Sequence, residues 1–257
     1  IRLTLRAKNI GPTKNAYGLF LMAKGPYLAT CEGDDFWLTE GKLQRQVDFL
    51  DQNPEYIGCS HQAIVVDETG RPIHRQRIRW VCSKQKITLK DFKGYFLPGQ
   101  ASTIVRRNLY GKYSNRDLSF FYQAHWAIGD RTTALIYLAQ GCFYQFQERL
   151  GCYRVVDKEQ SVTKKVYCRN KSWIREELLY TQRLKKFAWD SFGTRLDFDY
   201  YLANLLISSV LRLLRHPGRE TRMLVCDVLG AASSKHRVLA QVPGVLCKKI
   251  FDYFFAV

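Results

Sequence analysis

The chain has 257 residues, of which 46% are hydrophobic and 14% are aromatic. This composition excludes a disordered or low-complexity chain and indicates one large folded domain, or one domain with an appendage. The formal net charge of +17 is spread over both halves of the chain. It favours anionic partners such as nucleotide phosphates, phospholipid headgroups or nucleic acid. A basic surface that is merely solvated is an equal alternative for most individual lysine and arginine residues.

Cysteine usage points to a reducing compartment. Eight cysteines are present, but none forms a C-x-x-C pair, so a structural zinc site is not expected. Several lie in apolar runs, as reduced core thiols of a cytosolic protein do, and we therefore expect a cytoplasmic protein. No apolar run reaches the roughly 18–20 residues that a membrane-spanning helix needs.

The first predicted elements surround a short buried strand. Alternating apolar and polar residues predict a strand at Ile1–Leu5, and helical spacing predicts a helix over Asn15–Lys24. A buried strand follows at Tyr27–Cys31. Thr39 is expected to be the N-cap of the next helix, which Asn53–Pro54 should end.

Strands and helices continue to alternate along the middle of the chain. Strands are predicted at Tyr56–Val66, Ala101–Val105 and Cys142–Gln147. Helices are predicted between them, at Thr88–Lys93 and Thr132–Gln140. This alternation indicates α/β layering with much of the sheet parallel.

The pattern becomes purely helical after about residue 165. The predicted helices are Ser172–Trp189, Asp199–Arg215, Pro217–Ala232 and Pro243–Phe254. The last two begin with proline, which suits the first turn of a helix. We therefore divide the chain into an α/β domain at 1–165 and a C-terminal helical region at 166–257.

Two basic amphipathic segments of the helical region have two compatible interpretations. Leu211–Arg215 and Lys248–Phe255 combine basic and apolar side chains. Such segments can lie on an anionic membrane surface. They can equally belong to a helical layer packed on the α/β domain.

Three carboxylates crowd the end of the strand Tyr27–Cys31: Glu32, Asp34 and Asp35. In open α/β sheets, ligands bind beyond the carboxyl ends of the strands. Mg²⁺ and Mn²⁺ take oxygen ligands, usually one or two carboxylates, and phosphates and waters complete the shell. These residues therefore predict a divalent metal that holds a nucleotide diphosphate. The alternative is that one of the aspartates caps a turn.

The segment Glu32–Tyr56 resembles the region around the acid motif of family 2 glycosyltransferases, the inverting enzymes with the GT-A fold. Several elements occur in the order typical of the family's bacterial members: Gly25 with Tyr27, Glu32–Asp35, Phe36–Trp37, Lys42–Gln44 and Asn53–Pro54. Upstream, Ala7–Gly11, Asn15 and Ala23–Gly25 are similar to the family's nucleotide-side loop and helix. The resemblance covers roughly residues 5–165. It implies a Rossmann-like, mostly parallel sheet with flanking helices.

The resemblance implies a metal-dependent inverting transferase acting in cell-surface polysaccharide biosynthesis. The donor would be a nucleotide diphosphate sugar, with a UDP-sugar as the first expectation, and the acceptor a glycan or a lipid-linked glycan. Mg²⁺ or Mn²⁺ would bind at Asp34, Asp35 and Glu32. The donor-binding residues would be Asn9, Gly11, Asn15 and Arg154, and the acceptor-binding residues Trp37, Gln100, Ser102 and Trp126. On residue type alone, several of these are ordinary strand or core residues.

Asp130 is the candidate catalytic base. It follows Gly129 and precedes the helix predicted at Thr132–Gln140, so capping of that helix is the plain structural interpretation. In the family that the chain resembles, an acidic residue at this place takes the proton of the acceptor hydroxyl, which is otherwise a weak nucleophile. Attack from the face opposite the departing diphosphate inverts the anomeric configuration.

The sequence departs from the family pattern in two places. Family members often have a histidine two residues after the pair that corresponds to Tyr153–Arg154, whereas this chain has Val156. Further nucleotide-binding strands precede the position of Ile1–Leu5 in the family. We therefore expect an N-terminally truncated domain that alone binds a nucleotide sugar poorly and turns over little.

A function of a different class is a non-catalytic basic module that binds a membrane surface or nucleic acid. The net charge of +17 favours it, but the chain shows no motif that reads RNA or DNA, so specific nucleic-acid binding is not expected. A basic protein of either class could lie peripherally at the inner face of the cell membrane.

Overall fold

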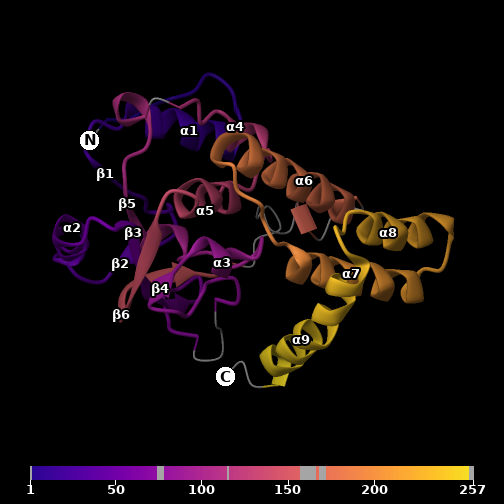
Figure 1. Cartoon of the computed structure of the whole chain (residues 1–257). Coiled ribbons are helices and arrows are strands. Elements are labelled where there is room, and N and C mark those ends of the chain that lie inside the picture. Colours follow the sequence, from indigo (N-terminus) through magenta and orange to yellow (C-terminus); the bar gives the residue numbers. More distant parts are fainter. Residues whose placement is uncertain (1, 74–77, 115, 157–165, 168–171, 255–257) are drawn as a thin grey trace.

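The computed structural model describes the backbone of residues 2–73, 78–114, 116–156, 166–167 and 172–254. A sheet with flanking helices occupies one end of the molecule, and a group of longer helices occupies the other (Figure 1). Four predictions fall partly or wholly outside these residues. They concern Ile1 of the first predicted strand, Phe255 of the last amphipathic segment, the cysteine at position 168, and the domain boundary near residue 165.

The described strands form one sheet in the order β1-β5-β3-β6-β2, and β4 also pairs with β6. The long central strands β3 and β6 run parallel. The remaining strand pairs described are antiparallel. The strands are β1 Tyr27–Ala29, β2 Phe36–Trp37, β3 Tyr56–Val66, β4 Lys86–Ile87, β5 Val105–Arg107 and β6 Cys142–Arg154.

The α/β class is confirmed, but the sheet is mixed, and our expectation of a mostly parallel sheet is wrong. β1 and β3 do point the same way, as the alternation predicts for a strand–helix–strand unit. They do not touch, because β5 inserts antiparallel between them. Local hydrophobic pattern does not encode such an insertion, since it depends on the path of the chain between the strands.

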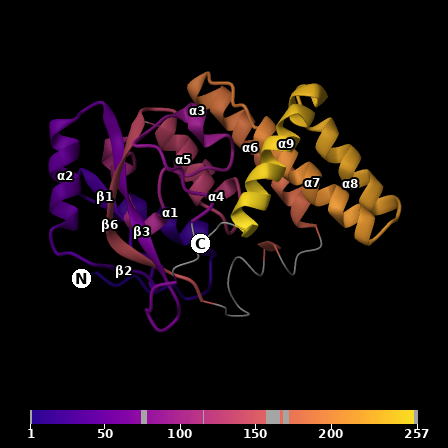
Figure 2. The same cartoon turned by 90° about the horizontal axis from the view of Figure 1, so that it is seen from below.

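Helices cover both faces of the sheet (Figure 2). On one face, Leu50 of α2 packs with Cys59, Val105 and Phe146. On the other face, the core is formed by residues 134–138 of α5 and by Phe143. The helices of this part are α1 Pro12–Met22, α2 Lys42–Gln52, α3 Leu89–Phe92, α4 Phe120–Gln123 and α5 Asp130–Leu138.

Two predicted strands are wrong. Residues 2–5 have no strand structure, and Leu3 and Leu5 are exposed. Their alternating pattern finds no sheet neighbour, because β1 is the edge strand of the described sheet. Ala101–Thr103 is a 3₁₀ helix, and β5 begins only at Val105. The Gln100 side chain accepts a hydrogen bond from the backbone N–H of Ser102, and this closes the turn.

Two predicted helix starts are also displaced. The N-cap of α2 is Gly41 and not Thr39, whose carbonyl accepts from Lys42 N in a preceding turn at 3.3 Å. Pro217 lies before the N-cap of α8, which is Gly218, and Pro243 lies inside α9. Proline inside a helix removes one backbone hydrogen bond, but α9 buries Val238 and Val245 on either side of it.

The described helices after residue 172 share a second core. α7 has the predicted bounds and supplies much of this core, including Leu202, Leu205 and Leu206. None of the described helices combines the length and apolar character that crossing a bilayer requires. The helices are α6 Trp173–Phe192, α7 Asp199–Arg215, α8 Arg219–Gly230 and α9 Lys235–Phe254.

A buried ion pair joins the α/β part to the helical region. The guanidinium of Arg131 on α5 contacts Glu177 on α6, and the two side chains are 7% and 1% exposed. The hydroxyl of Tyr201 on α7 donates to the same carboxylate at 2.5 Å, and that of Tyr167 donates at 3.1 Å. Burial would raise the pKa of Glu177, but the charge of Arg131 and the hydrogen bond from Tyr201 hold it below its ordinary value. The ion pair therefore fixes α5 against α6 and α7.

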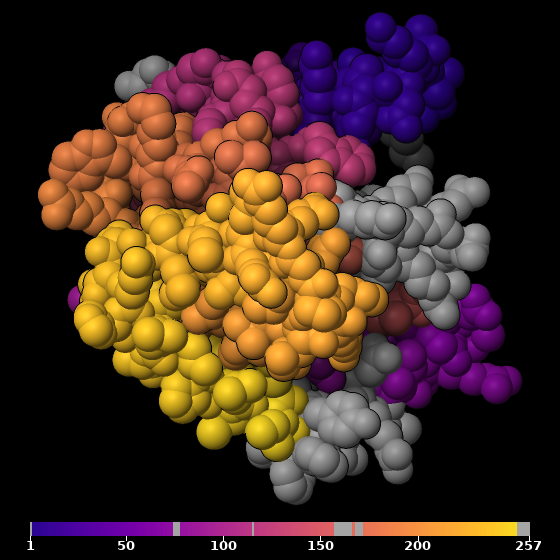
Figure 3. All heavy atoms as spheres, turned by 90° about the vertical axis from the view of Figure 1, so that its right-hand side faces the viewer, coloured from indigo at the N-terminus to yellow at the C-terminus, as the bar shows by residue number. Residues whose placement is uncertain are grey.

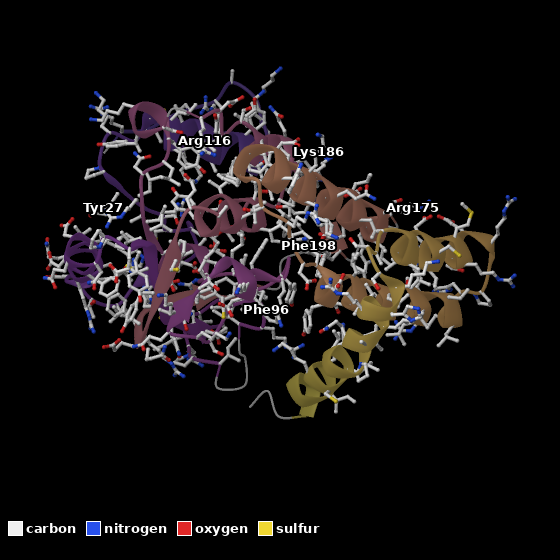
Figure 4. The ribbon with its side chains drawn as sticks, in the orientation of Figure 1. Tyr27, Phe96, Arg116, Arg175, Lys186 and Phe198 are labelled. Carbon is white, nitrogen blue, oxygen red and sulfur yellow. The ribbon has the colours of Figure 1, made fainter. Side chains whose placement is uncertain are left out.

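We predict that Glu177→Gln lowers the free energy of unfolding by about 3–5 kcal/mol, because it leaves a buried guanidinium without its counter-charge. Urea unfolding at neutral pH measures this. The matched control is Asp190→Asn on the same helix, which removes the exposed pair with Lys186 (Figure 4) and should cost less than about 1 kcal/mol.

The pH dependence follows from the lowered pKa of Glu177. Its contribution to stability is present at neutral pH and is lost as the pH falls below the ordinary value of 4.5. Wild type and the Glu177→Gln variant should therefore converge in stability as the solution is acidified. Equal stability of the two at neutral pH would contradict the assigned role of the ion pair.

Candidate active site

The three carboxylates after β1 form a tight loop between β1 and β2, which we call the acid tip (Glu32–Asp35). The backbone N–H of Asp35 donates to the carbonyl of Glu32 at 3.1 Å. The chain then enters β2, which pairs with β6 through Phe36 and Cys152. This pairing brings the acid tip against Arg154, whose backbone N–H donates to Asp35 Oδ1 at 2.9 Å.

The 3₁₀ helix before β5 holds the acid tip from the other side. Asp35 Oδ2 accepts from Ser102 Oγ at 2.6 Å and from Gln100 Nε2 at 2.8 Å. The same Gln100 amide donates to Glu32 Oε2 at 2.7 Å, and Ser102 Oγ accepts from Glu32 N at 2.8 Å. Gln100 and Ser102 are buried. The structure thus places these two predicted acceptor-binding residues as supports of the acid tip.

The two predicted tryptophans lie in different surroundings. Trp37 Nε1 donates to the carbonyl of Ser102 at 2.8 Å, which ties its indole to the support of the acid tip. The buried Lys42 ammonium lies 4.2 Å from the centre of the Trp37 ring, and burial lowers the pKa of Lys42 to about 8. Trp126 is 55% exposed, and its carbonyl accepts from Thr13 Oγ1 at the start of α1.

The predicted donor-side residues Asn9, Gly11 and Asn15 form one loop at the N-terminus of α1. Asn9 Oδ1 accepts from Gly11 N at 2.9 Å, and Gly11 O accepts from Asn15 N at 3.1 Å. Gly11 has a φ of +85°, a conformation that favours glycine. A Cβ there would lie 3.5 Å from the carbonyl of Trp126, so this loop borders the segment that leads to α5.

Arg154 binds main-chain oxygens. Its Nε donates to the carbonyl of Asp34 at 2.7 Å, and its Nη1 donates to that of Glu68 at 2.6 Å. The guanidinium also lies over the Phe36 ring, 5.5 Å from its centre. Arg154 therefore clamps the acid tip to the turn after β3, and its predicted contact with the donor stays a prediction. Val156, at the position of the family histidine, belongs to no described strand or helix.

Asp130 is the first residue of α5, directly after the N-cap Gly129. No side-chain hydrogen bond caps this helix, so the plain capping interpretation does not describe this aspartate. Its carboxylate is exposed to solvent and forms no hydrogen bond or ion pair with the described residues. Gly129 is required by packing, because a Cβ there would lie 2.8 Å from the Phe121 ring.

The charges of Asp130 and the acid tip act on the same groups. The pKa of Glu32 is raised to about 7 by partial desolvation, and then by the negative charges of Asp130, Asp35 and Asp34. The side chain of Tyr153 responds to the same four carboxylates, and burial together with their charges raises its pKa to about 12. Carboxylates from two distant segments, the acid tip and the start of α5, therefore act on the same two side chains.

Asp130 itself is partly desolvated despite its exposure. The surrounding protein raises its pKa, and the buried guanidinium of Arg106 on β5 opposes that rise. The sequence pointed to Asp130 and to the pair Tyr153–Arg154, but it assigned a role only to Arg154 within that pair. It missed Arg106, which stands in no local motif.

The donor atoms suit a hard cation that is shared with a ligand. Within the described parts of the chain, no group of three or more His, Cys, Asp or Glu side chains gathers closely enough to hold an ion by itself. Asp35 and Glu32 already accept hydrogen bonds from their supports. Mg²⁺ commonly takes only one or two carboxylates and completes its shell with phosphates. The oxygen-only donor set of the acid tip fits that mode and does not form an all-protein cage.

Comparisons with known proteins cover the N-terminal part of the chain. Residues 1–114 match the model of the family described as "Glycosyl transferase family 2". Domains of that family have the GT-A fold, and the α/β architecture of this chain agrees with it.

Curated relatives come from mycobacteria. The chain is 45% identical over 69 residues to "Uncharacterized protein Mb1547" of Mycobacterium bovis and to "Uncharacterized protein Rv1520" of Mycobacterium tuberculosis. Each match covers 27% of this chain and 20% of the relative. The chain thus spans about a fifth of the length of the curated relatives it matches.

We predict that Asp130→Asn lowers the pKa of Glu32 from about 7 toward its ordinary value of 4.5, because a negative charge that opposes ionisation is removed. A ¹³C-carboxyl NMR titration of the metal-free protein measures this pKa. Asp48→Asn on α2 removes the same charge away from the acid tip and should leave the titration unchanged. If Glu32 titrates identically in wild type and Asp130→Asn, the two carboxylates are not neighbours.

The raised pKa of Glu32 also determines how the stability of the protein changes with pH. Because the folded pKa of Glu32 lies above 4.5, the folded protein binds the proton more tightly than the unfolded chain. Its contribution to stability is therefore present below pH 4.5 and declines as the pH rises toward 7.

Proposed function

We propose that this chain, whose residues 1–114 belong to glycosyl transferase family 2, carries the metal-binding and acceptor-activating part of an inverting glycosyltransferase. The observation that carries the proposal is that the charges of Asp130 and of the acid tip act on the same side chain, Tyr153, and that Asp130 raises the pKa of Glu32. The donor is a nucleotide diphosphate sugar, with a UDP-sugar as the first candidate. The acceptor is a hydroxyl of a glycan or of a lipid-linked glycan.

Asp130 acts as the general base. Its carboxylate is engaged neither in capping α5 nor in an ion pair with the described residues, so it is available to an acceptor hydroxyl. It takes the proton of that hydroxyl as the oxygen attacks the anomeric carbon, while the bond to the diphosphate breaks on the opposite face. Its raised pKa makes it a stronger base, and the charge of Arg106 opposes that rise.

The acid tip is proposed to hold the metal that stabilises the leaving group. Asp34, Asp35 and Glu32 would hold Mg²⁺ or Mn²⁺, which when bound neutralises negative charge on the departing diphosphate. Gln100 and Ser102 keep the carboxylates of Asp35 and Glu32 in place through their hydrogen bonds. This support holds together groups that would otherwise repel one another.

The remaining predicted residues are assigned by their surroundings. The loop of Asn9, Gly11 and Asn15 is proposed to face the donor, and the exposed Trp126 beside it to contact the acceptor sugar. Trp37, which is tied to the support of the acid tip through Ser102, is proposed to contact the acceptor. We further propose a cytoplasmic reaction in cell-surface polysaccharide assembly, at the inner face of the membrane.

We predict that Asp130→Asn lowers the turnover number by roughly 10²–10⁴-fold, the usual contribution of a general base. Its affinity for Mn²⁺–UDP should be unchanged. Radiolabelled sugar transfer and calorimetric titration measure the two quantities. Glu148→Gln on β6 serves as the charge-matched control. Transfer by Asp130→Asn at a near wild-type rate would refute the assignment of the base.

Ser102→Ala should weaken divalent-metal binding by roughly 10–100-fold, because groups that orient metal ligands contribute at that level. The turnover number at saturating metal should change little, since Ser102 does not touch the reacting atoms. Mn²⁺ binding in the presence of UDP, followed by electron paramagnetic resonance, measures the affinity. Ser119→Ala removes an exposed hydroxyl elsewhere and should have no effect. Metal-independent transfer by wild type would remove the metal from the proposal.

A further inference from the structure

A cavity of about 800 Å³ lies in the helical region, between α6, the end of α7 and the start of α8. Its wall includes Trp173, Ile174, Leu211, Arg215 and Arg219. In Figures 1 and 2 these helices lie at the end of the molecule opposite β1 and β2. The cavity is therefore separate from the acid tip and is not used by the proposed transfer reaction.

The cavity is basic on one side. Arg212 and Arg215 from the last turn of α7, His216 after it and Arg219 at the start of α8 line this side. Glu220 is the acidic residue of the lining, and it lies 3.9 Å from Arg175 on α6 (Figure 4). The cavity thus presents an excess of guanidinium groups, whose planar fork suits phosphate.

The start of α8 adds to this positive potential. The helix begins at Arg219, has 12 residues, and no side chain caps its first turn. The backbone N–H groups of a helix start carry a partial positive charge that favours anions. Residues 218–221, which form this start, line the same cavity.

Apolar side chains are exposed beside the arginines. Leu214 is 73% exposed, more than any other large apolar side chain of the described helices, and Leu211 is 46% exposed. Both leucines lie in the last turns of α7, close to Arg215 in sequence. Met223 on α8 is 47% exposed. Figure 3 shows the face that the C-terminal helices form at this end of the molecule. A free phosphate or a nucleic acid would use the arginines but would gain nothing from the exposed leucines.

We propose that this end of the helical region docks on an anionic bilayer. The cavity takes the phosphate headgroup of an anionic phospholipid, and Leu211 and Leu214 enter the acyl-chain boundary. Charge complementarity and the adjoining apolar side chains both match such a surface. Because β1 and β2 lie at the opposite end, docking in this way leaves the acid tip accessible. The inference stands independently of the proposed transferase activity.

Co-sedimentation with vesicles tests the proposal. The protein should bind phosphatidylcholine vesicles that contain phosphatidylglycerol and should not bind pure phosphatidylcholine. Arg215→Glu combined with Arg219→Glu should weaken binding by roughly 20-fold or more, because each basic residue near the surface contributes about a factor of five. Lys24→Glu combined with Lys112→Glu makes the same charge change in the α/β part and should weaken binding far less.

The Leu214→Ser variant distinguishes binding to a bilayer from binding to a phosphate group alone. This variant keeps every charge and changes an exposed side chain, so it should fold normally, which circular dichroism verifies. It should lose affinity for phosphatidylglycerol vesicles and keep its affinity for soluble glycerophosphate.

Three outcomes would overturn the proposal. One is equal vesicle binding by the two double variants. Another is unchanged vesicle binding by Leu214→Ser. The third is displacement of the vesicles by an oligonucleotide at lower concentration than by glycerophosphate, which would assign the surface to nucleic acid.

Discussion

Four carboxylates at one end of the sheet repel one another, and the arrangement of the candidate site follows from how that repulsion is offset. Neutral hydrogen-bond donors offset part of this repulsion. The side chains of Gln100 and Ser102 and the backbone N–H of Arg154 donate to the carboxylate oxygens of Asp35. The pKa of Glu32 is raised to about 7 because burial, and then the surrounding negative charge, outweigh its hydrogen bond from Gln100. A divalent cation would relieve the same repulsion, which is the physical reason for expecting one here.

The position of Asp130 depends on contacts outside the sheet. The next residue, Arg131, points into the helical region and forms the buried pair with Glu177. The two neighbours at the start of α5 thus serve different parts of the molecule, since Asp130 acts on the acid tip and Arg131 joins α6 and α7. The residue next to the candidate base is therefore anchored in the helical region.

Local patterns predicted the elements but not their neighbours. Tyr56–Val66 and Asp199–Arg215 were predictable to the residue, because an apolar strand and a wide helical stripe are strong signals. The antiparallel insertion of β5 was not, since strand order depends on long-range chain path. Ile1–Leu5 shows the converse: an alternating pattern predicts a strand only where a neighbouring strand is present to pair with it.

The same distinction applies within the site. Asp34, Asp35 and Asp130 stand in recognisable motifs, so sequence alone could nominate them. It also nominated Gln100 and Ser102, but for contact with the acceptor, whereas their hydrogen bonds show them to be supports of the acid tip. A buried amide that donates to two carboxylates is visible only when β1 and β5 are placed side by side.

Taken together, the two proposals assign different tasks to the two ends of the molecule. A lipid-linked acceptor is confined to a surface, so an enzyme that stays at that surface meets it more often than one in solution. Leu214 and the arginines at the end of α7 and the start of α8 would supply residence at the membrane, while β1 and β2, which flank the acid tip, lie at the opposite end of the molecule. Under both proposals, the reacting hydroxyl of a lipid-linked acceptor would lie far from its lipid anchor, which would favour an elongated glycan over a single lipid-linked sugar.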